Sequence, residues 1–273
     1  MRTARVVPMH RIFGIAVTAV WLTAMGALFV RDIWPVWTAQ DPPPFIGRER
    51  NSQCGIYDAH GNRVGTAWSQ IWTSNDQARH ESVVKLDRLA KLPPVQIETA
   101  VTFTKDGTVD NFETRVYGMP MKIRIYGEAY GAYIPCMLEV GPFKRSFRLD
   151  AASSRSIAES IRSFDSLPEL RVGQSWRMQV IDPVSAILNQ QTRVSSVVAR
   201  VEREETIVHE GRPVRCFVVT AARTKAWVSA DGTVLRQESD VPGLGRLILE
   251  DEEFREDMYH RAKGDDRPRS PKQ

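Results

Sequence analysis

From residue 95 onward, apolar and polar side chains alternate with a period of two in one segment after another. Val95, Ile97 and Val101 lie on one side of this alternation, and Gln96 and Glu98 on the other. Successive side chains of a β-strand point to opposite faces, so this period is typical of a strand with one buried face. The pattern recurs between turn residues in segments 112–117, 121–126, 132–140, 143–149, 176–180, 197–204, 214–220, 225–238 and 246–250. The sequence therefore predicts a mainly β chain with an antiparallel sheet of about ten or more strands.

Four segments outside this pattern complete the expected elements. Residues 55–68 read as an opening hairpin that turns at 59–62. Residues 74–92 are mostly polar, and they are compatible with a loop plus a short helix. Residues 153–164 carry apolar side chains at helical spacing and are followed by Pro168, which predicts one short amphipathic helix. Residues 251–260 favour either a final strand or a short helix.

The strongest feature upstream of the sheet is an uncharged apolar run at residues 12–30, bracketed by Arg11 and Arg31. At 1.5 Å per residue a helix of this length spans roughly 28 Å, close to the thickness of a bilayer core. The basic residues before the run predict a cytoplasmic N-terminus and a domain on the far side of the membrane. Trp21 lies within the run, and Trp34 and Trp37 follow it, as expected of an interfacial anchor. The alternative is a cleaved signal peptide, but the run exceeds the usual apolar length and lacks a good cleavage site.

These features divide the chain into five expected parts. They are a cytoplasmic N-terminus (1–11), a transmembrane anchor (12–30), a linker with three prolines (31–51), an extracytoplasmic β domain (52–260) and a disordered, charged tail (261–273). Ala19, Thr23 and Ala27 form a stripe of small residues on one face of the anchor, which is a candidate contact for a partner helix. We therefore expect a single-pass protein of the inner membrane whose domain lies in the periplasm or outside.

Charge and cysteine content narrow the function classes. The net charge is +4 and the pI about 9.0, but acidic and basic residues are interleaved, so no nucleic-acid-binding arm is expected. Outside the cytoplasm one disulfide among Cys54, Cys136 and Cys216 is allowed, and the spacing does not choose a pair. For Cys216, in the middle of a strand, a buried free thiol is the simpler interpretation.

No recognisable catalytic or metal-binding motif is present in the sequence. The five histidines stand apart from any Cys or elbow-like Ser motif, and glycine-rich phosphate loops are missing. We therefore expect no catalytic residues, no metal and no cofactor. Two acidic clusters, one at 202–210 and one at 250–253, could support acid–base chemistry or bind Ca²⁺, but such runs at strand ends are more often solvated faces.

Aromatic side chains provide the candidate ligand site. If they share one concave face they could line an apolar pocket, although ordinary core packing explains the same residues. The candidates are Trp68, Trp176, Trp227, Phe103 and Phe147.

Four phrases in the β region resemble a bacterial envelope domain of unknown function that often stands upstream of transglutaminase-like domains. These phrases are GIYDAHGNRVGTAW (55–68), LRVGQSWRMQVIDP (170–183), GRPVRCFVVT (211–220) and KAWVSADGTVLRQE (225–238). The resemblance covers roughly residues 52–256. It implies a shape like that of lipoprotein-sorting (LolA-like) carriers, in which a curved sheet or open half-barrel wraps a helix and cups an acyl chain.

Two functions follow as expectations. The first is a non-catalytic, membrane-anchored binding or scaffold protein of the bacterial envelope. Such a protein could handle a lipid, a lipoprotein or a protein partner, or serve as an accessory subunit of a transport assembly. The second is an envelope hydrolase with an unrecognised active site.

Overall fold

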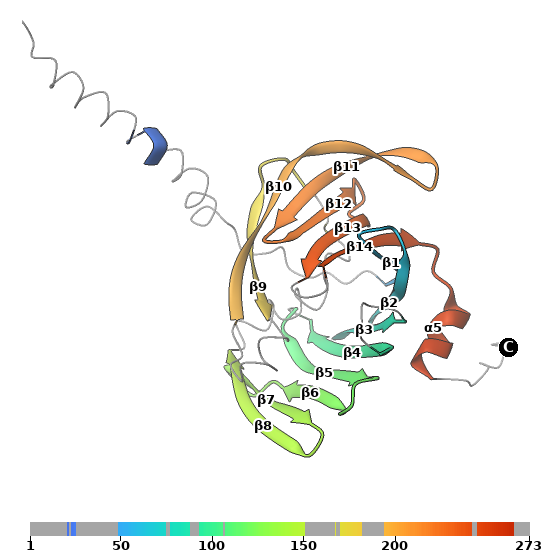
Figure 1. Ribbon diagram of the computed structural model, residues 1–273. Coiled ribbons are helices and arrows are strands. Elements are labelled where there is room, and N and C mark those ends of the chain that lie inside the picture. Colours follow the sequence, from blue (N-terminus) through green and yellow to red (C-terminus); the bar gives the residue numbers. More distant parts are fainter. Residues whose placement is uncertain are drawn as a thin grey trace, which may run out of the picture.

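The computed structural model describes residues 21, 23–25, 49–74, 77–87, 93–105, 107–150, 167, 170–181, 194–241 and 245–264. Among these residues the chain forms one 14-stranded antiparallel sheet and a short C-terminal helix (Figure 1). The prediction of a mainly β, antiparallel fold with few helices is therefore confirmed.

The strands form two consecutive meanders. The first comprises β1 (Arg50–Asp58), β2 (Arg63–Thr73), β3 (Gln77–Leu86), β4 (Val95–Thr104), β5 (Val109–Tyr117), β6 (Ile123–Glu128), β7 (Tyr133–Val140) and β8 (Phe143–Asp150). The second comprises β9 (Ser175–Ile181), β10 (Val194–His209), β11 (Arg212–Ala221), β12 (Thr224–Ser229), β13 (Val234–Val241) and β14 (Gly245–Glu252). The helix α5 (Glu256–Lys263) follows β14.

The first and last strands join the two meanders. β1 pairs with β14 in antiparallel register from Gln53–Glu252 to Asp58–Leu247, so the order across the sheet is β8 to β1 followed by β14 to β9. β8 and β9 are the two edges, and the sheet is therefore open. Figure 1 shows that it is strongly curved, as the half-barrel expectation requires at the coarsest level.

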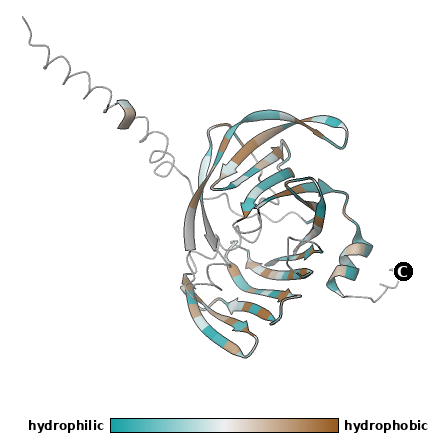
Figure 2. Ribbon diagram, in the orientation of Figure 1, coloured by the Kyte–Doolittle hydropathy of each residue, from teal (hydrophilic) through white to brown (hydrophobic). Residues whose placement is uncertain are grey.

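Hydrophilic and hydrophobic residues alternate along many of the strands (Figure 2), and successive side chains of a strand point to opposite faces of the sheet. One face is apolar and holds separate buried clusters in the two meanders, including Val101 and Ile134 in the first and Val201 and Val219 in the second, all with 0% exposure. On the opposite face, oppositely charged side chains pair across neighbouring strands. Lys144 of β8 lies 2.8 Å from Glu139 of β7, and Arg124 of β6 bridges Glu139 and Glu113. Opposite charges on neighbouring strands favour this register over one that would bring like charges together.

Strand β3 was not expected, since the sequence of residues 74–92 suggested a loop and a helix. Register pairing places His80 and Ser82 on the apolar face, next to Val101 and Thr99 of β4. On the charged face, Arg79 forms an ion pair with Glu81 at 2.8 Å. Because polar side chains occur on both faces of β3, its sequence does not show the alternation of apolar and polar residues that predicts a strand. Hydrogen bonding to β2 and β4 keeps the segment extended.

Helix α5 is held by tertiary contacts, because eight residues are too few for a stable isolated helix. Its Tyr259 is 1% exposed and packs against Trp68 and Val83. The Tyr259 hydroxyl donates to Glu81 at 3.3 Å, and Lys263 forms an ion pair with the same carboxylate. Residues 251–260 thus contain both expected elements, the end of a strand and a helix, and the helix continues three residues into the segment assigned to the tail.

Several predicted elements fall mainly outside the described residues. Trp21 and residues 23–25 are helical, and the Trp21 side chain is 59% exposed. Within the part of the chain that the structure describes, we find no helix of the length and apolar character that a membrane span requires. The helix predicted at 153–164 lies outside that part, as do Arg11, Ala19, Ala27, Arg31, Trp34 and Trp37.

The described residues of the connection between β8 and β9 contact the second meander. The Leu167 amide donates to the Gly232 carbonyl at 2.9 Å, and Leu170 joins the apolar cluster around Trp176. Since β8 and β9 are the outermost strands, this connection brings the chain from one edge of the sheet to the other.

Two glycines in turns of the first meander differ in the space around their Cβ positions. Gly118 follows β5 with a φ of +86°, and a Cβ atom there would lie 1.9 Å from the Pro94 carbonyl oxygen. Gly61 has a similar φ of +80°, but nothing lies within 4 Å of its Cβ position. We expect Gly61→Ala to destabilise the chain by about 1 kcal/mol through backbone strain alone. We expect Gly118→Ala to lose about 3 kcal/mol or more because the backbone must also move.

Denaturant unfolding of both full-length variants measures the difference. Equal losses in the free energy of unfolding would contradict the prediction, because they would show that the backbone around Pro94 moves to accommodate the added methyl group at no cost.

Candidate functional site

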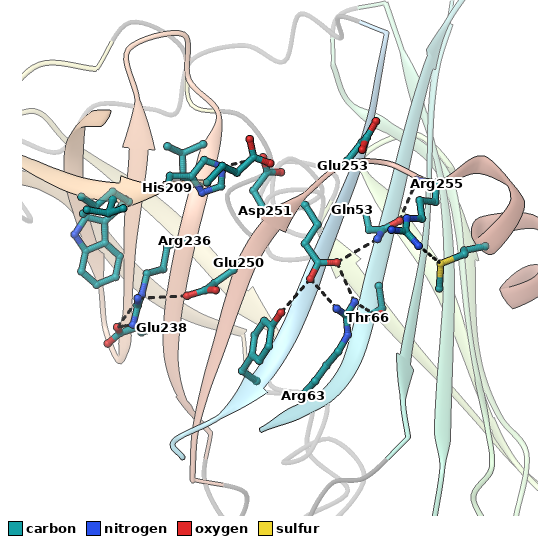
Figure 3. Close-up of a pocket in the computed structure, with 18 of the residues that line it drawn as sticks. Gln53, Arg63, Thr66, His209, Arg236, Glu238, Glu250, Asp251, Glu253 and Arg255 are labelled. Atoms are coloured by element: carbon teal, nitrogen blue, oxygen red, sulfur yellow. Dashed lines mark hydrogen bonds and ion pairs between the residues drawn. The ribbon is translucent and has the colours of Figure 1, made fainter. Parts of the chain in front are cut away.

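A groove of about 990 Å³ lies where the two meanders meet (Figure 3). Its lining comes from β1, β2, the tip of the β10–β11 hairpin, β12, β13, β14 and the start of α5. The β1–β14 pairing brings these segments together, so the groove depends on contacts between residues about 200 positions apart in the chain.

One side of the groove is aromatic and apolar. Trp227 of β12 and Leu235 of β13 are 6% and 7% exposed, and Ile207 of β10 packs against them. The Trp227 indole N–H donates to Glu205 at 3.4 Å, which fixes the ring against the hairpin. Lys225 lies 4.2 Å from the centre of the Trp227 ring, within the range of a cation–π contact.

The centre of the groove is organised by Glu252, the last residue of β14. Arg63 of β2 donates to both of its carboxylate oxygens, at 2.8 and 2.9 Å. Gln53 and Tyr57 of β1 donate to it at 3.2 and 3.1 Å. Burial alone would raise the pKa of Glu252, but these hydrogen bonds, above all that of Arg63, hold the pKa below its usual range.

A glycine makes this convergence possible. A Cβ atom at Gly55 would lie 2.3 Å from a Glu252 oxygen and 2.8 Å from the Tyr57 ring. Only a residue without a side chain lets the carboxylate and the ring share this part of the sheet surface.

A second acidic side chain is held differently. The Asp251 carboxylate lies 4.0 Å from the His209 ring at the tip of the β10–β11 hairpin. Burial raises the pKa of Asp251 to about 6, although the charges of Arg50 and His209 act in the opposite direction. The two side chains are 24% and 19% exposed, so both are partly buried where the β10–β11 hairpin meets the end of β14.

The groove lining is predominantly acidic. Its acids are Asp87, Glu205, Glu210, Glu238, Glu250, Asp251, Glu252 and Glu253, and its basic side chains are Arg63, Arg236, Arg255 and His209. Arg236 bridges Glu238 and Glu250, whereas Glu210 and Glu253 are exposed at the rim. Among the described residues no group of His, Cys, Asp and Glu has an arrangement suited to a metal ion. The arrangement is suited to holding a polar ligand that carries positive charge.

The five aromatic candidates lie in four separate clusters, and only Trp227 lines this groove. Trp68 is covered by α5 and donates to Gln53 at 2.9 Å, and Trp176 belongs to the apolar core of the second meander. Phe103 and Phe147 share the apolar cluster of the first meander.

The acidic clusters, which sequence reasoning interpreted as solvated faces, are brought together instead. Glu205 and Glu210 come from one cluster, and residues 250–253 form the other. The alternation of Glu250 and Glu252 on one face of β14 was a usable signal. The partners of Glu252, which are Gln53, Tyr57 and Arg63, were not identifiable, because the β1–β14 pairing cannot be read from local pattern.

One Ser–His pair lies elsewhere in the sheet. Ser69 Oγ of β2 is 2.7 Å from His80 Nε2 of β3, and both side chains are buried. They belong to the apolar face, where a row of hydroxyls crosses five paired strands, formed by Ser52, Ser69, Ser82, Thr99 and Thr114. β2 pairs on both sides, so its own backbone N–H groups are used in the sheet. The pair has the spacing of a nucleophile and a base.

The cysteines show no reactive arrangement. No disulfide joins Cys54, Cys136 and Cys216. Burial raises the pKa of the Cys136 thiol to about 12 and raises that of Cys216. Cys216 is 1% exposed within β11, which confirms a buried free thiol at that position.

Comparisons with known proteins do not identify a family. No protein-family description matches the chain, and no curated protein matches it. A crystal structure of a DUF1089 family protein from Pseudomonas aeruginosa, at 1.80 Å resolution, is similar with 13% identity and a TM-score of 0.32. The match covers 65% of this chain and 90% of that chain. The comparisons thus give no support for a lipoprotein carrier or a transglutaminase-associated domain.

The raised pKa of Asp251 gives a test of the groove's electrostatics. A carboxyl whose pKa is higher folded than unfolded favours the folded state when protonated, and this contribution is lost as pH rises through about 6. We therefore expect Asp251→Asn to stabilise the chain by about 2–3 kcal/mol at about pH 7.5, and by only about 1 kcal/mol at about pH 4.5.

Thermal unfolding at the two pH values measures this effect. Asp87→Asn is the matched control, because Asp87 also lines the groove but its side chain is 58% exposed. A pH-independent effect of Asp251→Asn would contradict the burial of that carboxyl.

Proposed function

We propose that the chain is a non-catalytic binding module of the bacterial envelope that holds a basic, extended polypeptide segment in the groove. In this proposal residues 12–30 anchor it in the inner membrane, with the N-terminus in the cytoplasm and the sheet outside. The supporting observation is the groove itself, where one apolar wall around Trp227 faces carboxylates already positioned by Arg63 and Arg236. A peptide with alternating apolar and basic side chains complements both surfaces.

A peptide fits this groove better than an acyl chain does. The apolar lining consists of five side chains, and the other lining side chains are charged or polar. The apolar five are Ile207, Val208, Trp227, Leu235 and Met258. In the carriers that the sequence resembles, an acyl chain would lie on the apolar face of the half-barrel. Here the described core of that face is already covered, since Val101, Ile134 and Val219 are 0% exposed. The open, curved sheet is compatible with that resemblance, while the ligand differs.

The peptide would belong to a protein partner, which makes the accessory-subunit role the favoured form of this function. The small residues Ala19, Thr23 and Ala27 remain the candidate contact with a partner helix in the membrane. Carboxylates that are already held by arginines lose little conformational entropy when a ligand binds. Their negative charge also disfavours acidic partners.

A charge-reversal experiment tests the groove. The probe is a fluorescently labelled peptide of repeated Lys-Val, titrated with the full-length chain in a mild non-ionic detergent. The test variant is Glu210→Lys/Glu253→Lys at the exposed rim of the groove. We expect it to weaken binding at least about tenfold, roughly 1.4 kcal/mol, as read by fluorescence anisotropy.

The matched control reverses two exposed acids outside the groove, Glu49→Lys/Glu128→Lys, and keeps the same net charge as the test variant. Equal weakening by both variants would show only long-range attraction, and it would overturn the proposed site. Absence of peptide binding by the parent chain would do the same.

The alternative function, an envelope hydrolase, is favoured by one observation, the 2.7 Å contact between Ser69 and His80. Because both side chains are buried within the sheet, we expect no labelling of the full-length chain by a fluorophosphonate probe, as read by intact-mass spectrometry. Labelling that disappears in Ser69→Ala and persists in Ser82→Ala would establish the hydrolase instead.

A further inference from the structure

Two neighbouring hairpin ends expose large apolar side chains. Met119 and Met121, between β5 and β6, are 39% and 46% exposed, and Phe143 at the start of β8 is 71% exposed. The two ends are in contact, because the Gly141 amide donates to the Lys122 carbonyl at 2.9 Å. The Met121 sulfur lies 3.2 Å from the position that a Cβ atom on Gly141 would take. Residues 118–122 and 141–145 therefore form one surface, called here the hairpin patch.

The hairpin patch is basic as well as apolar. Its sequence contains Lys122, Lys144 and Arg145 and no acid. The nearest described acid is Glu139, which forms ion pairs with Lys144 at 2.8 Å and Arg124 at 3.8 Å and offsets part of this charge. At the opposite end of the same strands, the turn 129–132 contains no charged residue, and 105–108 contains one Lys and one Asp. Among the turns of these strands, the excess of positive charge lies at the end that carries the exposed Met and Phe side chains. Arg148 of β8 lies toward the other end, over the Tyr133 ring.

We propose that the hairpin patch docks on the surface of an anionic lipid bilayer. Met119, Met121 and Phe143 would enter the region beneath the headgroups, and Lys122, Lys144 and Arg145 would contact the lipid phosphates. Apolar side chains surrounded by cations are the combination that binds such a surface, because burial of apolar area and attraction to anionic lipids add.

The shape of the patch favours a bilayer over a protein partner. A stable protein interface buries about 800 Å² on each side, usually around a packed central pocket. Here only three large apolar side chains protrude from two turns, next to Pro120 and Pro142. They form separate protrusions instead of a continuous surface of that size. A fluid bilayer accommodates such protrusions without a complementary shape.

Docking would also set the orientation of the groove. The register of the sheet places the patch at the same end of the strands as the β1–β2 turn. His209, Asp251 and Glu252 lie at the opposite end, where β1 begins and β14 ends. A sheet docked through the patch would present the His209 end of the groove away from that bilayer surface.

A local fluorescence probe tests this proposal. The full-length chain carries an NBD fluorophore on Met119→Cys, and it is mixed with phosphatidylcholine vesicles with or without phosphatidylglycerol, in the presence of doxyl-labelled lipid. We expect a blue-shifted emission and quenching by the doxyl group only in the anionic vesicles. The matched control places the probe on Tyr130→Cys, 70% exposed at the opposite end of the sheet, where neither change is expected.

Further variants keep the test specific. The parent chain labelled in the same way measures any background from Cys54. With the probe at position 119, Met121→Asp/Phe143→Asp is expected to abolish the quenching while the circular dichroism spectrum remains unchanged.

The control at Tyr130 separates docking of the patch from attachment through residues 12–30, which would bring the vesicle close without selecting the position of the probe. Equal quenching at both positions, equal quenching in both kinds of vesicle, or no quenching at all would overturn the proposal. A blue shift that requires an added protein instead of lipid would overturn it as well.

Discussion

The pairing of β1 with β14 is the constraint on which the rest of the structure depends. Each meander is a run of neighbouring hairpins that can form from local turns, but a single antiparallel ladder joins the two runs. Without that ladder the apolar face would be divided and two more strand edges would be exposed to water. Both halves of the groove lining would also separate, because Arg63 belongs to the first meander and Glu252 to the second.

The junction is polar where it meets the groove and apolar on the opposite side. Ile56 of β1 and Leu249 of β14 are register partners that pack in one cluster on the apolar face. On the other face the Glu252 carboxylate accepts hydrogen bonds from three side chains of β1 and β2. Hydrogen bonds to a charged acceptor are stronger than neutral ones, so the same residues that line the groove also hold its two halves in register. Binding and fold stability therefore share one set of contacts.

Much of the sheet could be predicted from the sequence. In segments such as β4 and the β12–β13 hairpin, the alternation of apolar and polar residues predicts the buried face, and the turn residues predict where the strand ends. β3 could not be predicted, because polar His80 and Ser82 occupy positions on its apolar face. Its extended conformation depends on pairing with β2 and β4. The site was harder still. Trp68 and Trp227 are equivalent as residue types, yet α5 covers one and the groove includes the other. Glu252 looked like part of a solvated acidic run until long-range pairing placed Arg63 beside it.

The two strands left at the edges of the sheet raise a separate problem, which is uncontrolled growth of the sheet by strand addition. An unpaired edge is a template for a second chain, and proteins commonly block it with charged side chains. On β8, Lys144, Arg145 and Arg148 would meet like charges if two copies aligned edge to edge. Arg148 is also held over the Tyr133 ring at 5.1 Å, which keeps one of these charges at the edge. The cations of β8 therefore disfavour strand addition at one of the two edges of the described sheet.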